Sequence, residues 1–173
     1  MTSETTSKSN HLSTILFAFG ALLFVAGCLT LEHMRGGVVS HHLLADPNLP
    51  AISNWFGALT LPALGALFGY RLALTKRSRA MFTIFAIALL YGAVLAGTFA
   101  YDAPHLTNTM FMALAPLAVL LPIYRIEYVF GFVVGTTYTF GGVLPLLIWV
   151  VFGTMSYVLR WVIKTLWRKI KHR

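Results

Sequence analysis

The sequence is built from apolar runs of about twenty residues, separated by short polar or basic stretches. An α-helix needs ~20 such residues to cross the ~30 Å hydrocarbon core of a bilayer at 1.5 Å per residue. Hydrophobic residues make up 58% of the chain, charged residues only 10%, and the mean hydropathy is +0.77. A water-facing exterior cannot be built from this composition. The sequence therefore predicts an all-α integral membrane protein whose main partner is the lipid bilayer.

The number of runs predicts six transmembrane helices. The stretch from Tyr128 to Ile163 carries one charge, Arg160, and is too long for a single crossing. We expect it to fold back at Gly141-Gly142, which Pro145 follows. The expected helices cover residues 12–31, 55–74, 81–100, about 106–123, 126–140 and 143–163. Together they form a transmembrane domain of residues 12–163, which includes a structured outer loop (33–54). We expect a disordered polar N-terminus (1–11) before this domain and, after it, a basic cytoplasmic tail (164–173) that continues the last helix.

The distribution of basic residues predicts the orientation. With six crossings both ends lie on one side, and cytoplasmic loops are enriched in lysine and arginine. Of the 13 lysines and arginines, all except Arg35 fall on the side of the two termini. This twelve-to-one split predicts a bacterial inner (plasma) membrane protein with both termini in the cytoplasm. It also explains the net charge of +8 without a nucleic-acid partner.

The predicted outer face is rich in histidine and acidic residues, and we take it as the candidate site. Histidine suits proton or ligand handling because its pKa lies near neutrality. The predicted ligand-binding residues are His41, His42, Asp46, Asn54, Asp102 and His105. Glu32 and His33 are predicted to lie on the same face.

A divalent metal is one possible occupant of this face. If residues 38–46 are helical, His42 and Asp46 lie four positions apart on one helix face, and His105 arrives from another loop. No HExxH motif is present, and the alternative is that these histidines simply occupy a wet interfacial loop. The sequence therefore leaves the metal open.

Other cofactors and reactions find less support. No lysine lies in the middle of a predicted span, as a retinal Schiff base requires, and no histidine lies there to hold haem. Walker and dinucleotide-binding motifs are absent, so no nucleotide is expected. Ser40 and Ser53 are not flanked by a G-x-S-x-G elbow. Whether the chain is an enzyme stays open.

Small residues predict where helices pack. Gly65 and Gly69 form one GxxxG pair, and Gly131 and Gly135 form another, which allows a neighbouring helix to approach closely. The threonines that follow Gly135 are expected to face inward and bond to carbonyls. At the inner face, Arg125 and Glu127 are either interfacial charges of a tight turn or part of a gate or proton relay.

The first apolar run ends in Val25-Ala26-Gly27-Cys28, which holds the single cysteine of the chain. This tetrapeptide resembles the lipobox of bacterial lipoproteins, and the resemblance covers the first 28 residues. It implies cleavage before Cys28 and lipidation of its thiol. The alternative, which we favour, is a cysteine buried in an uncleaved first helix.

Three functions remain after these exclusions. The leading hypothesis is a small transporter or ligand-binding membrane protein whose outer-face cluster meets the substrate. The second is a membrane-embedded, metal-dependent enzyme that acts on lipid or lipid-linked substrates. The third is a non-catalytic subunit or assembly factor of a membrane complex, with the GxxxG faces as partner surfaces. A homo-oligomer goes with the transporter hypothesis, because six short helices enclose little volume.

Overall fold

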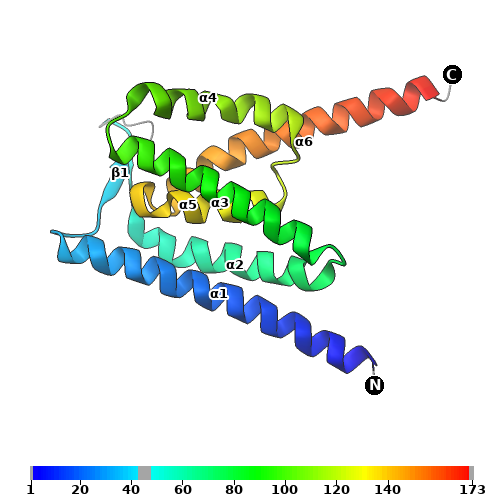
Figure 1. Ribbon diagram of the computed structural model, residues 1–173, viewed down its shortest axis with the longest axis horizontal. Helices are drawn as coiled ribbons and strands as arrows, with labels where there is room; N and C mark the ends of the chain where they lie inside the picture. The colour runs from blue at the N-terminus through cyan, green and yellow to red at the C-terminus, as the bar shows by residue number, and fades with distance from the viewer. Residues whose placement is uncertain (1, 43–47, 172–173) are drawn as a thin grey trace.

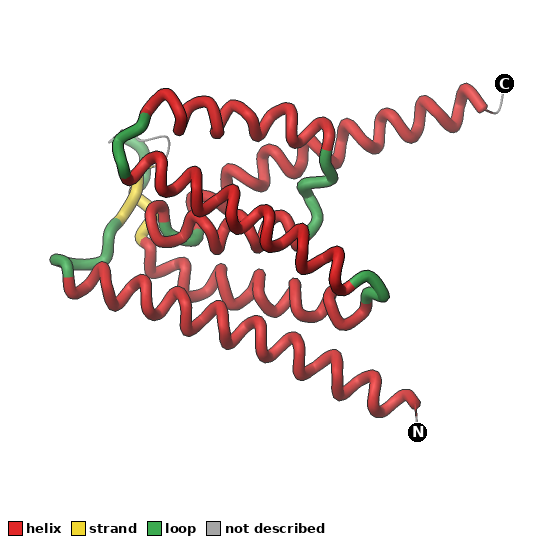
Figure 2. The backbone as a smooth tube through the Cα atoms, viewed as in Figure 1, coloured by secondary structure: helices red, strands yellow, loops and turns green. Residues whose placement is uncertain are grey.

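The computed structural model describes residues 2–42 and 48–171, and within them the chain is almost entirely helical (Figure 1). The helices are α1 (Thr2–Met34), α2 (Gly57–Leu74), α3 (Ser78–Ala100), α4 (Pro104–Leu120), α5 (Ile126–Phe140) and α6 (Val143–Lys171). Strands β1 (Ser40–His42) and β2 (Ala51–Ser53) and the 3-10 helix η2 (Asn54–Phe56) connect α1 to α2 (Figure 2). The all-α prediction is confirmed. Four helical segments, His11–Met34, Asn54–Leu74, Ser78–Ala100 and Val143–Lys169, are long and apolar enough to span a membrane.

The helices form three layers of two, with α1 and α2 on one side, α3 and α5 in the middle, and α4 and α6 on the other side (Figure 1). One apolar core lies between the first two layers around Phe68, whose ring centroid is 5.4 Å from that of Phe130. A second core lies between the middle and third layers, where the Phe132 and Trp149 ring centroids are 4.5 Å apart. Helix α5 contributes to both cores and is therefore the centre of the bundle.

Helix α5 has the bounds that the sequence predicts, and the reason lies in the glycine that ends it. Its bounds agree with the expected range 126–140, and Gly141 ends it with a φ of +70°, a backbone conformation that glycine adopts readily. Thr136 and Thr137 are buried, and their hydroxyls donate to carbonyls of the preceding turn, Phe132 O and Val133 O. The prediction of inward-facing hydroxyls is confirmed for these two threonines, whereas Tyr138, which it also included, is exposed.

Both GxxxG pairs are used inside the chain. A Cβ added to Gly65 would lie 2.5 Å from the Phe17 carbonyl oxygen of α1, and one added to Gly69 would meet Ser13. Similarly, Gly131 and Gly135 of α5 press against the backbone of α3. These four glycines therefore hold α1 against α2 and α3 against α5. They are not free to serve as surfaces for a partner protein.

Side chains of α6 hold the end of α4. Helix α4 leaves its last carbonyls without intrahelical partners, as every helix does. Trp149 Nε1 donates to Ile123 O at 2.8 Å, Ser156 Oγ donates to Leu121 O at 2.8 Å, and Arg160 Nη2 donates to Leu120 O at 2.6 Å. These bonds anchor the third layer at the end of the bundle where both chain ends lie.

The chain departs from the sequence predictions in two places. Residues 38–46 are not helical where they are described, because Ser40–His42 pairs antiparallel with Ala51–Ser53, with His41 opposite Ile52. The β-branched Val38 and Val39 favour extended backbone before the strand, and Asn54 N donates to Val39 O at 3.0 Å. Residues 2–11, which their polar composition predicts to be disordered, continue α1, since a helix already nucleated by an apolar run extends at little cost.

Candidate functional site

Glu32 lies at the centre of a polar cluster at the hairpin end of the bundle. It occupies the last turns of α1, where the apolar run ends. Asn54 Nδ2 donates to Glu32 Oε1 at 2.7 Å, and the backbone N–H of Val39 donates to Glu32 Oε2 at 3.1 Å. One carboxylate therefore joins α1 to the chain before β1 and to the chain after β2.

Asn54 is buried and packs against the turn between α5 and α6. A Cβ at Gly141 would collide with the Asn54 side-chain amide, and glycine at that position also accommodates the positive φ. The amide is therefore held between Glu32 on one side and the Gly141 backbone on the other. An amide clamped in this way presents a fixed orientation to anything that binds beside it.

A second link crosses the cluster. The Nη1 of Arg35, which follows α1, donates to the hydroxyl of Tyr138 at 2.6 Å, and Tyr138 lies in the last turn of α5. Arg35 is the one basic residue that the charge distribution of the sequence predicts for the outer face. Its bond to Tyr138 ties the α1 end of the molecule to the central helix.

These groups surround a cavity of about 330 Å³, which we call the outer pocket. Its size falls at the lower end of the range for small-molecule sites, roughly 300 to 1,000 Å³. The polar side chains that line it are Glu32, Arg35, His41, Asn54, Tyr138 and Thr139. A carboxylate, a guanidinium, an imidazole, an amide and two hydroxyls therefore converge from three segments of the chain.

His41 is the unsatisfied member of this group. Its Nε2 is buried and has no hydrogen-bond partner within the described part of the chain. Burial lowers the pKa of His41 below its ordinary value of 6.5, and the negative charge of Glu32 partly opposes that shift. Because a buried polar atom without a partner costs about 1–3 kcal/mol, His41 is suited to receive a hydrogen bond from, or give one to, a ligand in the outer pocket.

The lowered pKa of His41 predicts a pH dependence. The folded state favours the neutral imidazole, so the unfolded state binds more protons as the pH falls below about 6.5. We expect this contribution to stability to be complete above pH 6.5 and to be lost as the pH falls through that value toward the lowered pKa. Thermal unfolding at pH values from about 7.5 to 5 should show a smaller acid loss of Tm in His41→Gln than in the wild type. Ser40→Ala, on the same strand, keeps the titrating group and should follow the wild type.

The chain matches no protein-family model, no curated protein and no solved structure. Function therefore has to be argued from the geometry of this molecule.

The structure separates the predicted site residues. His41 and Asn54 line the outer pocket, whereas the Nδ1 of His42 is engaged with Leu49 O at 2.7 Å. Asp102 lies in the turn between α3 and α4 and His105 in the first turn of α4, at the hairpin end of the bundle but not in the outer pocket (Figure 1). Asp46 lies outside the described residues. Across residues 2–42 and 48–171, no three His, Cys, Asp or Glu side chains are grouped to hold a metal ion.

Four of the six polar residues that line the outer pocket, Glu32, Arg35, Tyr138 and Thr139, are not in the predicted set. Glu32 is one of the predicted outer-face acids, but its distance of 22 positions from Asn54 along the chain gives no sign that the two side chains form a hydrogen bond. Arg35 and Tyr138 are 103 positions apart, and their contact depends on α5 lying beside α1. The one usable signal was the placement of Glu32 and Arg35 directly at the end of an apolar run, where a charged side chain is costly unless it has a partner.

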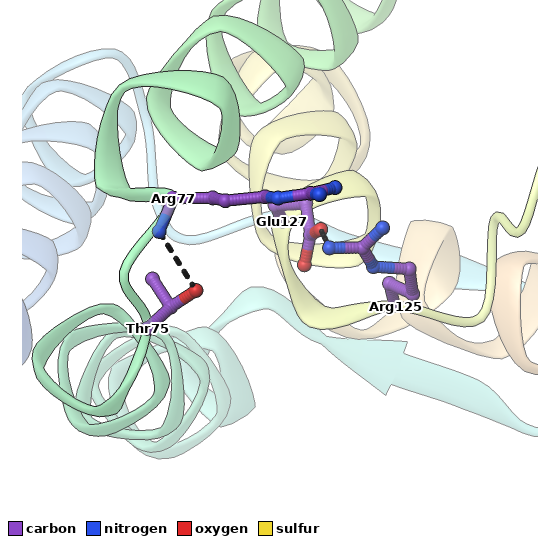
Figure 3. A network of polar contacts seen from close by, with 4 residues as sticks. All are labelled: Thr75, Arg77, Arg125 and Glu127. Atoms are coloured by element: carbon purple, nitrogen blue, oxygen red, sulfur yellow. Dashed lines mark hydrogen bonds and ion pairs between the residues drawn. The ribbon is translucent and has the colours of Figure 1, made fainter.

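A separate polar contact lies at the opposite end of α5. Arg125 Nη2 and Glu127 Oε1 form an ion pair at 2.5 Å, and the Glu127 side chain is only 3% exposed. Figure 3 shows the Arg77 side chain extending from the start of α3 toward Glu127. The backbone N–H of Arg77 donates to Thr75 Oγ1 at 3.3 Å, which shapes the α2–α3 turn. The carboxylate is thus buried at a helix N-terminus, where the helix dipole favours negative charge.

Cys28 lies within α1 and is buried. The next residue, Leu29, belongs to the first apolar core. Burial within a continuous helix is the setting that the buried-cysteine alternative requires.

Proposed function

We propose that the protein is a small transporter or ligand-binding membrane protein whose outer pocket receives a small polar molecule. The observation that carries this proposal is the convergence of Glu32, Arg35, His41, Asn54 and Tyr138 on one cavity, with His41 Nε2 left without a partner. Purely structural polar clusters normally satisfy their buried groups. A cluster that leaves one buried nitrogen open beside a cavity has the composition of a binding site.

The chemistry of the walls points to a zwitterion. Glu32 supplies negative charge, and Arg35 supplies positive charge at the same cavity. Both charges are already engaged within the protein, so a ligand would add hydrogen bonds to an existing network rather than neutralise a bare charge. An amino-acid-sized zwitterion, with donors and acceptors at both ends, suits this arrangement better than a strongly anionic or cationic molecule.

A ligand screen tests the proposal. Protein in phosphatidylcholine nanodiscs would be unfolded thermally with amino acids, small sugars and polyamines as separate probes. We expect a zwitterionic amino acid to raise Tm, because a ligand at about 100 times its Kd stabilises the folded state by ~2.7 kcal/mol. His41→Ala should weaken binding by roughly tenfold, which is the effect of losing about 1.4 kcal/mol. The matched control is His42→Ala, on the same strand but outside the outer pocket.

Two results would count against this function. One is a panel in which no zwitterion changes Tm. The other is equal loss of binding in His41→Ala and His42→Ala, which would show that the hairpin as a whole matters and the pocket does not.

For the topology, we infer six crossings of a bacterial inner membrane with both termini in the cytoplasm. Supporting this, both ends of the described chain lie at one end of the bundle, and the β1–β2 hairpin lies at the other (Figure 1). Helices α4 and α5, with 17 and 15 residues, are shorter than a typical span. Helix α5 is covered by other helices, so its length need not match the lipid.

Cysteine labelling tests the orientation. In a Cys28→Ala background, Ser40→Cys places a thiol on the exposed hairpin, and Arg79→Cys places one at the exposed start of α3. We expect a membrane-impermeant maleimide to label Ser40→Cys in intact cells and Arg79→Cys only after permeabilisation, because the positive-inside rule puts the two on opposite sides. The reverse pattern would contradict the orientation, and labelling of both in intact cells would contradict the crossing number.

One observation supports the alternative of a protein that handles lipids. A cavity of about 220 Å³ lies among α3, α4, α5 and α6, in the half of the bundle nearer the hairpin, with walls that include Phe99, Phe111 and Phe132. Such walls suit an acyl or isoprenoid chain. However, none of its lining residues is a His, Cys, Asp, Glu or Ser, and the Thr107 hydroxyl already donates to Thr98 Oγ1. This cavity therefore favours binding of a lipid chain over chemistry performed on it.

A further inference from the structure

At the end of the bundle opposite the hairpin, a cavity of about 460 Å³ lies between α2, the start of α3 and the start of α5. We call it the inner cavity. Its rim carries two arginines, Arg71 from the last turn of α2 and Arg125 from the chain before α5. Arg125 also holds the buried Glu127. Arg77, whose side chain extends toward Glu127 in Figure 3, is not among the residues that line the inner cavity.

The charge balance around the inner cavity is positive. Between residues 47 and 173 the sequence contains two acids, Asp102 and Glu127, and Asp102 belongs to the opposite end of the bundle. Glu127 therefore offsets one of the two arginines that line the inner cavity and leaves the other. In addition, α3 and α5 both begin here without a side-chain cap on their first N–H groups, and the positive end of each helix dipole favours an anion.

The walls of the inner cavity change character with depth. Below the arginines the lining is apolar, with Leu64 and Leu67 from α2 and Val129 from α5. Leu67 is 47% exposed, so this wall opens to the surroundings of the bundle. A free water-soluble anion gains nothing from an apolar wall, whereas a phospholipid presents a phosphate followed by acyl chains. The order of charge and apolar surface matches that of a lipid.

We propose that the inner cavity binds an anionic phospholipid of the cytoplasmic leaflet. Its phosphate would lie at Arg71 and Arg125, and an acyl chain would follow Leu64, Leu67 and Val129. Basic pockets between transmembrane helices on the cytoplasmic side bind anionic headgroups for the same reasons of charge and geometry. The leaflet rests on the orientation proposed above, but binding itself does not, because it can be measured in detergent.

The test compares three probes on purified full-length protein in dodecyl maltoside. Native mass spectrometry and thermal unfolding would be carried out with phosphatidylglycerol, phosphatidylcholine and inorganic phosphate. We expect retained phosphatidylglycerol and a raised Tm, with little effect of the other two. Arg71→Gln should weaken phosphatidylglycerol binding by about fivefold, the effect of ~1 kcal/mol per basic residue at an anionic surface. Leu67→Trp, which fills the apolar wall, should weaken it without changing charge.

Arg79→Gln is the matched control, since Arg79 is exposed, lies at the same end and does not line the inner cavity. Equal losses in Arg71→Gln and Arg79→Gln would overturn the proposal in favour of diffuse surface charge. Equal binding of phosphatidylcholine would overturn it in favour of unspecific lipid contact. If inorganic phosphate displaces phosphatidylglycerol and Leu67→Trp binds phosphatidylglycerol as well as the wild type does, the inner cavity is a site for a free anion instead. None of these outcomes bears on the outer pocket, whose ligand test uses phosphatidylcholine alone.

Discussion

Gly135→Ala is expected to destabilise the bundle strongly, even though it adds a single methyl group. The new Cβ would meet the Leu89 carbonyl oxygen of α3 and lie 2.8 Å from the Ala93 nitrogen. Both are backbone atoms, so no side chain can rotate away and the helices must separate. Overpacking of this kind costs about 1–3 kcal/mol. The measurement is the free energy of unfolding in a denaturing detergent titration.

Gly97→Ala is the control for this substitution. Gly97 is also helical, but a Cβ there meets no atom within 4 Å. Alanine is the better helix former by about 1 kcal/mol, so Gly97→Ala should be neutral or stabilising. The two variants make the same chemical change, and only Gly135→Ala is expected to lower stability. Equal effects would show that the α3–α5 contact is not close.

Arg125→Leu is expected to have a comparable or larger effect at the inner end of α5. It leaves the Glu127 carboxylate, 3% exposed, without its ion-pair partner. Removing one partner of a buried pair costs about 3–5 kcal/mol, because the remaining charge is left desolvated. Arg125 is 49% exposed, so solvent screens part of the interaction and we expect the lower end of that range. Unfolding in phosphatidylcholine, without anionic lipid, measures this effect alone.

The double variant Arg125→Leu with Glu127→Leu distinguishes a structural pair from a functional one. Once both charges are absent, nothing is left unpaired, and stability should return to within about 1 kcal/mol of the wild type. If the pair serves a gate or proton relay, the double variant recovers stability but loses function. Failure of the double variant to recover stability would mean that Glu127 has a further partner in the fold.

The two polar ends of the molecule share α5. Glu127 lies in its first turn, and Tyr138 lies in its last turn at the outer pocket. Between them α5 is packed through glycine contacts against α3 and through Phe132 against Trp149. One wall of the outer pocket therefore belongs to α5, the helix that contributes to both apolar cores. A tightly packed helix holds the side chains of a site in fixed positions.

Much of the helical architecture could be predicted from the sequence. The turn at Gly141-Gly142 was predictable because a 36-residue stretch with one charge cannot be one span, and glycine pairs mark turns. The small-residue contacts followed from the GxxxG spacing. A helix through residues 38–46, the condition for pairing His42 with Asp46, is not formed at Ser40–His42, because this three-residue strand is decided by its pairing partner, which local sequence does not reveal.

The candidate site was only partly predictable. His41 and Asn54 were found because polar residues gather in the segment after the first apolar run. Glu32, Arg35 and Tyr138 were missed because their roles depend on partners from other segments. His42 is the opposite case, a predicted residue that does not line the outer pocket. Its position beside His41 suggests a shared role, but its Nδ1 contacts Leu49 O instead.

The sequence by itself determined the class of protein and most of its helices, because the length and hydropathy of each apolar run can be read locally. Exposing apolar groups to water, or unpaired peptide groups to lipid, costs free energy, so each such run forms a helix in the bilayer. The tertiary structure alone decided which polar groups meet. Glu32 finds Asn54 22 positions away, and Arg35 finds Tyr138 103 positions away, because the bundle brings the end of α1 beside the end of α5. The sequence places histidines in the outer loop 33–54, and the fold pairs Ser40–His42 with Ala51–Ser53, which brings His41 and Asn54 to the pocket that Glu32 lines.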